Sequence, residues 1–119
     1  MPQVLDPPTQ RKLALNQVLF REVNEQIRSL TPSADESGLE LVCECSHDAC
    51  KKRLPIEVTA YEAVRRFPTR FVVAPGHEIY GVERVVESNR DYNVVEKIEA
   101  AAPVAIRLDP RAQGLRGAA

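Results

Sequence analysis

Apolar residues recur at three- to four-residue steps in the first quarter of the chain, and charged residues fill the positions between them. The spacing predicts an amphipathic helix of about 20 residues, capped by Thr9 and ending near Leu30. The predicted buried face consists of Leu13, Val18, Leu19, Phe20, Val23, Ile27 and Leu30. The predicted solvent face consists of Arg11, Arg21, Glu22, Glu25 and Arg28. Residues 31–38 are polar and rich in helix breakers, which predicts a loop.

Shorter apolar runs follow and predict strands, with one helix among them. Strands are expected at 39–43 and 55–58, then a helix from Thr59 to about Phe67, with Thr59 and Glu62 forming a capping box. Residues 71–74 form a continuous apolar run, which favours a central strand buried on both faces. Residues 82–87 and 92–98 flank a polar turn and predict an antiparallel hairpin.

These elements predict an α+β fold, with a long N-terminal helix and a short second helix packed on a small, mainly antiparallel sheet. The 119 residues suffice for one core, and with 44% hydrophobic but only 5% aromatic residues that core would gain from a metal staple. We expect a flexible lead-in over 1–8, one zinc-stapled domain over 9–105 and a flexible tail over 106–119.

Three cysteines lie within eight residues, at Cys43, Cys45 and Cys50. Clustered thiols in a reducing compartment indicate metal ligands or redox groups rather than a disulfide framework. A structural zinc ion takes four ligands in a tetrahedron, so one more ligand is required. The candidates are His77, which follows a Pro-Gly turn at the end of a predicted strand, and His47, inside the cluster.

We favour His77, because a site built with it joins two distant loops, whereas His47 would close only a very small chelate ring. The sequence alone leaves other interpretations of the three cysteines open. The cysteines could be small buried hydrophobic residues without a metal, or Cys50 could form a redox pair with one of the others. If one zinc ligand were water, Asp48 or Glu78 could act as a general base. A complete Cys3His set favours a structural ion instead.

The net charge of −1 and the pI near 6.1 argue against nucleic-acid binding by bulk charge alone. A local basic group remains, and its members are the candidate contacts for nucleic acid or a protein partner. They are Lys51, Lys52, Arg53, Arg65 and Arg66. Neither an N-terminal targeting segment nor an apolar run long enough for a membrane span is evident, so we expect a cytoplasmic protein without membrane partners.

Five short sequence motifs lie along residues 15–111. They are Phe20–Glu25, Cys43-Glu44-Cys45, Tyr61–Arg65, Arg70–Glu78 and Val94–Lys97. In this order they resemble a group of small bacterial proteins, seen mainly in actinobacteria, that have no assigned activity. The resemblance implies that the motif around His77 and the cysteine cluster occur together and form one site.

The sequence therefore predicts a non-enzymatic zinc-binding interaction or regulatory module of the bacterial cytoplasm, with another protein as its partner and a homodimer as one form of that partnership. Two alternatives stay open. One is a nucleic-acid-binding zinc protein that uses the basic loop after Cys50, and the other is a thiol redox sensor.

Overall fold

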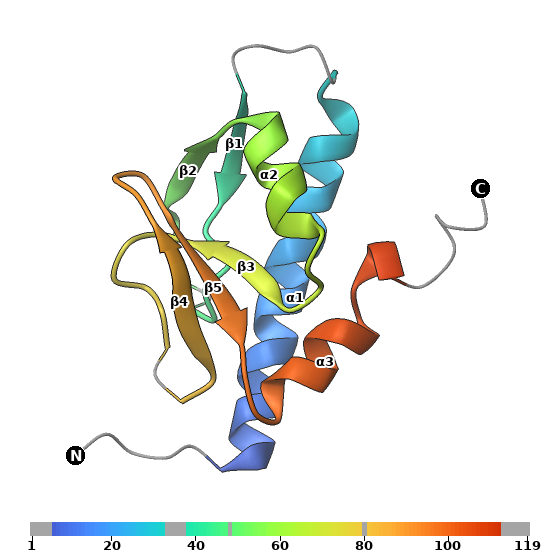
Figure 1. Cartoon of the computed structure of the whole chain (residues 1–119), viewed down its shortest axis with the longest axis vertical. Coiled ribbons are helices and arrows are strands. Elements are labelled where there is room, and N and C mark those ends of the chain that lie inside the picture. Colours follow the sequence, from blue (N-terminus) through green and yellow to red (C-terminus); the bar gives the residue numbers. More distant parts are fainter. Residues whose placement is uncertain (1–5, 33–37, 48, 80, 113–119) are drawn as a thin grey trace.

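The computed structural model describes residues 6–32, 38–47, 49–79 and 81–112, and it confirms the α+β class. A long helix runs along the molecule, with the strands on one side of it and two short helices beside it (Figure 1). In chain order the elements are α1 (Pro7–Leu30), β1 (Leu39–Val42), β2 (Arg53–Ile56), α2 (Val58–Arg65), β3 (Arg70–Val73), β4 (Glu83–Ser88), β5 (Asn93–Lys97), α3 (Ala101–Arg107) and the 3-10 turn η1 (Pro110–Ala112).

The strands form two antiparallel sheets rather than one. Strands β1 and β2 pair with each other, and the second sheet has the order β3-β5-β4. The predicted hairpin of β4 and β5 is confirmed. The prediction of a central strand at 71–74 was wrong, because β5 occupies the centre and β3 the edge of that sheet.

The open edge of β3 is nevertheless covered, which explains why its residues are as buried as those of a central strand. The backbone N–H of Glu44 donates to the Val72 carbonyl at 2.8 Å. The Val72 N–H donates in turn to the Glu44 carboxylate at 2.9 Å. Glu44 thus joins the segment after β1 to the second sheet.

The predicted faces of α1 were wrong at several positions, although Val18 is buried and Arg11 and Glu22 are exposed as expected. Gln17, Arg21 and Asn24 are completely buried, whereas Leu19 is 66% and Leu30 84% exposed. Helix α1 lies over strand ends and loops whose backbone groups need hydrogen-bond partners. The Arg21 guanidinium, for example, donates to the carbonyls of Pro68 and Ala105, at 2.7 and 2.9 Å, so polar residues take the inner face.

The helix boundaries also differ from the prediction. Helix α1 begins at Pro7 with Asp6 as its N-cap, because proline is well tolerated in a first turn whose N–H groups lack helical partners. Helix α2 begins at Val58, before Thr59, so the predicted capping box does not form. The Glu62 carboxylate instead accepts hydrogen bonds from Arg28 and Arg111.

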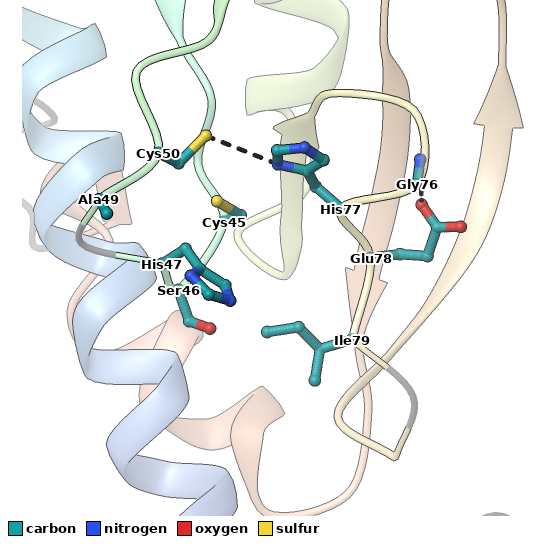
Figure 2. A pocket seen from close by; sticks show the side chains of 9 residues that line it. All are labelled: Cys45, Ser46, His47, Ala49, Cys50, Gly76, His77, Glu78 and Ile79. Atoms are coloured by element: carbon teal, nitrogen blue, oxygen red, sulfur yellow. Dashed lines mark hydrogen bonds between the residues drawn. The ribbon is translucent and has the colours of Figure 1, made fainter.

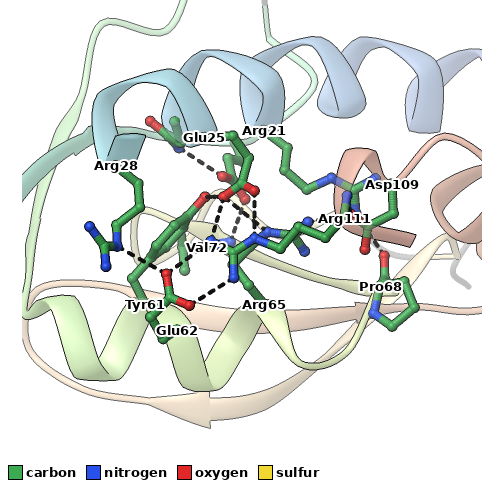
Figure 3. A network of polar contacts seen from close by, with 12 residues as sticks. Arg21, Glu25, Arg28, Tyr61, Glu62, Arg65, Pro68, Val72, Asp109 and Arg111 are labelled. Atoms are coloured by element: carbon green, nitrogen blue, oxygen red, sulfur yellow. Dashed lines mark hydrogen bonds and ion pairs between the residues drawn. The ribbon is translucent and has the colours of Figure 1, made fainter. Parts of the chain in front are cut away.

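The expected domain boundary at residue 105 falls inside ordered structure. Helix α3 continues to Arg107, and the buried Asp109 accepts a hydrogen bond from Arg65. Arg111 donates to the carboxylates of Glu25 and Glu62 at 2.6 to 3.0 Å (Figure 3). These ion pairs hold residues 106–111 against α1 and α2. The expected lead-in over 1–8 overlaps α1, which begins at Pro7. Residues 1–5 of the lead-in, 33–37 of the expected loop and 113–119 of the expected tail lie outside the described residues.

The core combines both sheets with α2. Its largest fully buried members include Tyr61, Phe71, Leu41 and Leu54, and the buried Cys43 and Cys45 pack in the same cluster. A smaller apolar cluster joins the start of α1 to α3. The cysteine-bearing segment is therefore anchored in the core, and this anchoring fixes the position of two sulfur atoms.

Candidate metal centre

The loop between β1 and β2 carries all three cysteines. Its base is held by the Cys43 N–H, which donates to the Lys52 carbonyl at 3.1 Å and extends the pairing of the two strands. Its tip is closed by the Cys50 N–H, which donates to the His47 carbonyl at 3.0 Å. Cys43 and Cys45 alternate with Glu44 in extended backbone, so their side chains point to one face and Glu44 to the other.

His77 is positioned by a tight turn after β3. Its N–H donates to the Ala74 carbonyl at 2.9 Å, and Pro75 and Gly76 occupy the central positions of that turn. Proline is favoured at the first of these positions, and the second requires positive φ in a type II turn, which Gly76 supplies with φ 87°. The Glu78 carboxylate stabilises the turn, because it accepts hydrogen bonds from the Gly76 N–H at 3.1 Å and from the Asn93 amide at 3.2 Å.

The three sulfurs and the His77 ring come together in space. One ligand atom from each of the four residues lies within 4.8 Å of all the others. The His77 Nδ1 is 3.6 Å from the Cys43 sulfur and 3.5 Å from the Cys50 sulfur. In a tetrahedron with zinc–sulfur bonds of about 2.3 Å and zinc–nitrogen bonds of about 2.0 Å, nitrogen and sulfur stand about 3.5 Å apart. These two nitrogen–sulfur distances therefore match those of a tetrahedral metal site.

Burial shapes the chemistry of the thiols. Desolvation raises the pKa of Cys43, and the nearby Cys45 and Cys50 raise it further, although the Ala74 N–H, which donates to the Cys43 sulfur at 3.1 Å, lowers it. Desolvation likewise raises the pKa of Cys45. Thiolates crowded in such surroundings need a cation, so a metal ion bound here would displace protons and would bind more weakly as the pH falls.

The cluster opens on one side to a cavity of about 630 Å³. Cys45, Cys50 and His77 lie on its wall, and Figure 2 shows the two sulfurs and the His77 ring facing a common space. Cys43 and Cys45 are buried, whereas Cys50 is only half-buried. The site is therefore closed on the core side and accessible from the cavity.

The structure separates the two histidine candidates. His77 belongs to the four-residue cluster, and His47, which is exposed, does not. Figure 2 shows the His47 ring pointing away from the sulfurs of Cys45 and Cys50. Of the two carboxylates considered as a general base, Glu78 is engaged in its own turn, and Asp48 lies outside the described residues.

The basic group divides into exposed and buried members. Lys51, Lys52, Arg53 and Arg66 are exposed. Arg65 is only 4% exposed and pairs with Asp109, so its expected place among surface contacts was wrong. Its position on the inner face of α2 turns its guanidinium toward Asp109 and Glu25 rather than toward solvent.

Sequence reasoning missed the polar residues that support the cluster from behind. The Glu44 carboxylate accepts a hydrogen bond from the Asn24 amide at 2.7 Å, and the Gln17 amide donates to the Glu44 carbonyl at 2.8 Å. Desolvation raises the pKa of the Glu44 carboxyl, although its hydrogen bonds from Asn24 and from the Val72 N–H, together with two nearby arginines, oppose the rise. The available signal was the position of Glu44 between two cysteines in extended backbone. If Cys43 and Cys45 face a metal ion, the Glu44 side chain must point to the opposite face, toward the core, where its charge needs partners.

Comparisons of the chain with protein-family models, with curated proteins and with solved structures found no match. The functional argument therefore rests on this site. Cys43, Cys45, Cys50 and His77 could hold one metal ion.

Proposed function

We propose that the chain binds one structural zinc ion through Cys43, Cys45, Cys50 and the Nδ1 atom of His77, and that it acts as a non-enzymatic interaction or regulatory module. The convergence of these four ligand atoms within 4.8 Å is the observation that carries the proposal. Three thiolates and one imidazole in a tetrahedral arrangement favour zinc among the common biological metals. Ligand thiols that must stay reduced also favour a cytoplasmic location.

The ion would staple two loops that belong to different sheets. Cys43, Cys45 and Cys50 lie between β1 and β2, and His77 follows β3. Structural zinc sites contribute about 10–16 kcal/mol of binding free energy in zinc-finger peptides, and whole domains are stable by only about 5–15 kcal/mol. The metal would therefore decide whether this small core stays folded.

The donor set supports a non-catalytic role. Catalytic zinc keeps one coordination position for water or substrate, whereas four protein ligands fill a tetrahedron. The neighbouring Glu78 carboxylate holds the turn that carries His77, so its contacts give it a positioning task.

Metal analysis of the purified full-length protein tests the proposal. We expect one zinc ion per chain, lost in His77→Ala and kept in the matched variant His47→Ala. Chelation should unfold the protein, and zinc should restore its folded spectrum. A native protein without stoichiometric metal, or one that folds equally well after chelation, would refute the structural site. Zinc-dependent turnover of an ester or nucleotide, abolished in folded Glu78→Ala, would refute the non-enzymatic role.

One observation favours nucleic-acid binding as a second candidate function. Lys51, Lys52 and Arg53 are consecutive, exposed and directly follow the ligand Cys50. Phosphate contacts from such a segment would weaken steeply with salt. A mobility shift at low salt that is lost in Lys51→Glu/Lys52→Glu, but kept in Arg90→Glu on the hairpin turn, would support this function. No shift at low salt would rule it out.

A further inference from the structure

The outward face of α1 carries a line of exposed aliphatic side chains. Leu15 is 45%, Leu19 66% and Val23 44% exposed, at successive four-residue steps, and Leu30 continues the line at 84%. At 1.5 Å per residue this ridge extends over about 22 Å. We call these four residues the α1 ridge.

The ridge is the reverse of the usual arrangement in a surface helix, which buries its apolar stripe. The inner face of α1 is occupied by polar side chains that bind the rest of the fold. Asn24 exchanges hydrogen bonds with the Val42 backbone at 2.8 and 2.9 Å, and Gln17 donates to the Glu83 carboxylate at 3.2 Å. Rotating α1 to bury its leucines would leave these partners without hydrogen bonds. The ridge is therefore held outward by the fold.

The charges beside the ridge indicate what covers it. Arg11 and Lys12 are exposed near the start of α1, and Glu22 is exposed about three turns later. Two α1 helices that cross in parallel would place like charges together. Two antiparallel helices would bring the basic end of one alongside the acidic turn of the other, and would also oppose their helix dipoles favourably.

We propose that the α1 ridge is a homodimer interface in which α1 of one copy packs antiparallel on α1 of a second copy, centred near Leu19. A two-fold axis at that position places Leu15 of each copy near Val23 of the other. It also brings Arg11 and Lys12 within about one helical turn of Glu22 of the other copy. Such an interface is self-complementary and closes at two copies. It uses the face of α1 opposite the one that packs on β1.

Sedimentation analysis of the full-length, metal-loaded protein over a roughly hundredfold concentration range tests the interface, because dimer content follows mass action. We expect a dimer in the wild type and a dissociation constant raised by roughly tenfold or more in Leu19→Asp. Ile106→Asp, at an exposed aliphatic position on α3, is the matched control and should dimerise normally. Circular dichroism and zinc content should be unchanged in both variants, which separates this test from that of the metal site.

Charge variants test the antiparallel register. Glu22→Arg and Arg11→Glu/Lys12→Glu should each be monomeric, because each places like charges together at both ends of the pair. An equimolar mixture should form a heterodimer, in which both ends again carry opposite charges. A wild type that stays monomeric throughout, or a dimer insensitive to Leu19→Asp, would overturn the interface. A mixture that stays monomeric would overturn the antiparallel arrangement.

Discussion

Asn24 is the residue whose replacement tests most directly how α1 supports the metal centre. Its amide donates to the Val42 carbonyl at 2.8 Å and to the Glu44 carboxylate at 2.7 Å, and its oxygen accepts from the Val42 N–H at 2.9 Å. Val42 and Glu44 flank the proposed ligand Cys43 in the sequence. Asn24→Ala therefore removes three hydrogen bonds directly behind the cluster.

The expected loss of stability follows from these bonds. Each neutral bond to Val42 contributes about 1 kcal/mol, and the bond to the buried carboxylate about 1.5–3 kcal/mol. The full sum is about 4 kcal/mol. Val42 is only half-buried, so water can replace part of what it loses. We therefore expect the free energy of unfolding to fall by about 3 kcal/mol.

Urea unfolding of the zinc-loaded protein measures this loss. For a slope of about 1–3 kcal/mol per molar urea, the midpoint should move down by roughly 1–3 M. The matched control is Asn16→Ala, on the same helix. It has the same small gain in helix propensity, and its side chain makes no hydrogen bond within the described part of the chain. The difference between the two variants isolates the lost contacts.

A difference below about 1 kcal/mol would contradict the reasoning, because buried partners left without hydrogen bonds cost more than that. Such a result would mean that Glu44 or Val42 forms new hydrogen bonds in the variant. The polar inner face of α1 would then not determine which side of the helix faces the core.

Three further predictions concern the cluster and the C-terminal ion pairs. Gly76→Ala should weaken zinc affinity about tenfold in a metal titration, since positive φ costs a residue with a Cβ about 1–2 kcal/mol. When a thiol reagent competes with zinc in the folded protein, Cys50, which lines the cavity, should be alkylated before the buried Cys43, as mass spectrometry of peptides would show. Arg111→Ala should destabilise the fold at pH 7 in thermal unfolding, because hydrogen bonds from Arg111 lower the pKa of Glu62. That stabilisation is present above the unfolded pKa of about 4.3 and is lost as pH falls through the lower folded value.

Each of these predictions has its own control. Pro75→Ala keeps the positive φ at Gly76 and should affect zinc binding less, and equal effects would argue against the turn as the cause. Excess zinc should slow the alkylation of Cys50, and faster alkylation of Cys43 than of Cys50 would contradict the burial of Cys43. Arg90→Ala, on the exposed hairpin turn, should leave the acid dependence unchanged. A loss in Arg111→Ala that does not shrink at low pH would exclude the carboxylate as its source.

The sequence alone determined the α+β class, the hairpin and the set of four candidate ligands. These features depend on short-range signals. A strand alternates every second residue, a Pro-Gly pair at 75 and 76 fixes a turn, and three cysteines within eight residues lie close together in almost any fold. The choice of His77 over His47 needed only the argument that a metal should join distant loops. The structure brings His77 into the cluster and leaves His47 outside it.

Tertiary structure decided which side of each helix faces inward and which residues after α3 pack on the rest of the fold. The periodicity of α1 predicts one apolar and one polar face. The backbone and carboxylate groups beneath the helix need hydrogen-bond partners, and therefore Gln17, Arg21 and Asn24 lie on its buried side. In the same way Asp109 and Arg111 lie in the predicted tail, and only the tertiary structure pairs them with Arg65 and Glu25. Hydrophobic pattern is a local property, whereas satisfying a buried backbone group or pairing a buried charge depends on residues far away in the chain.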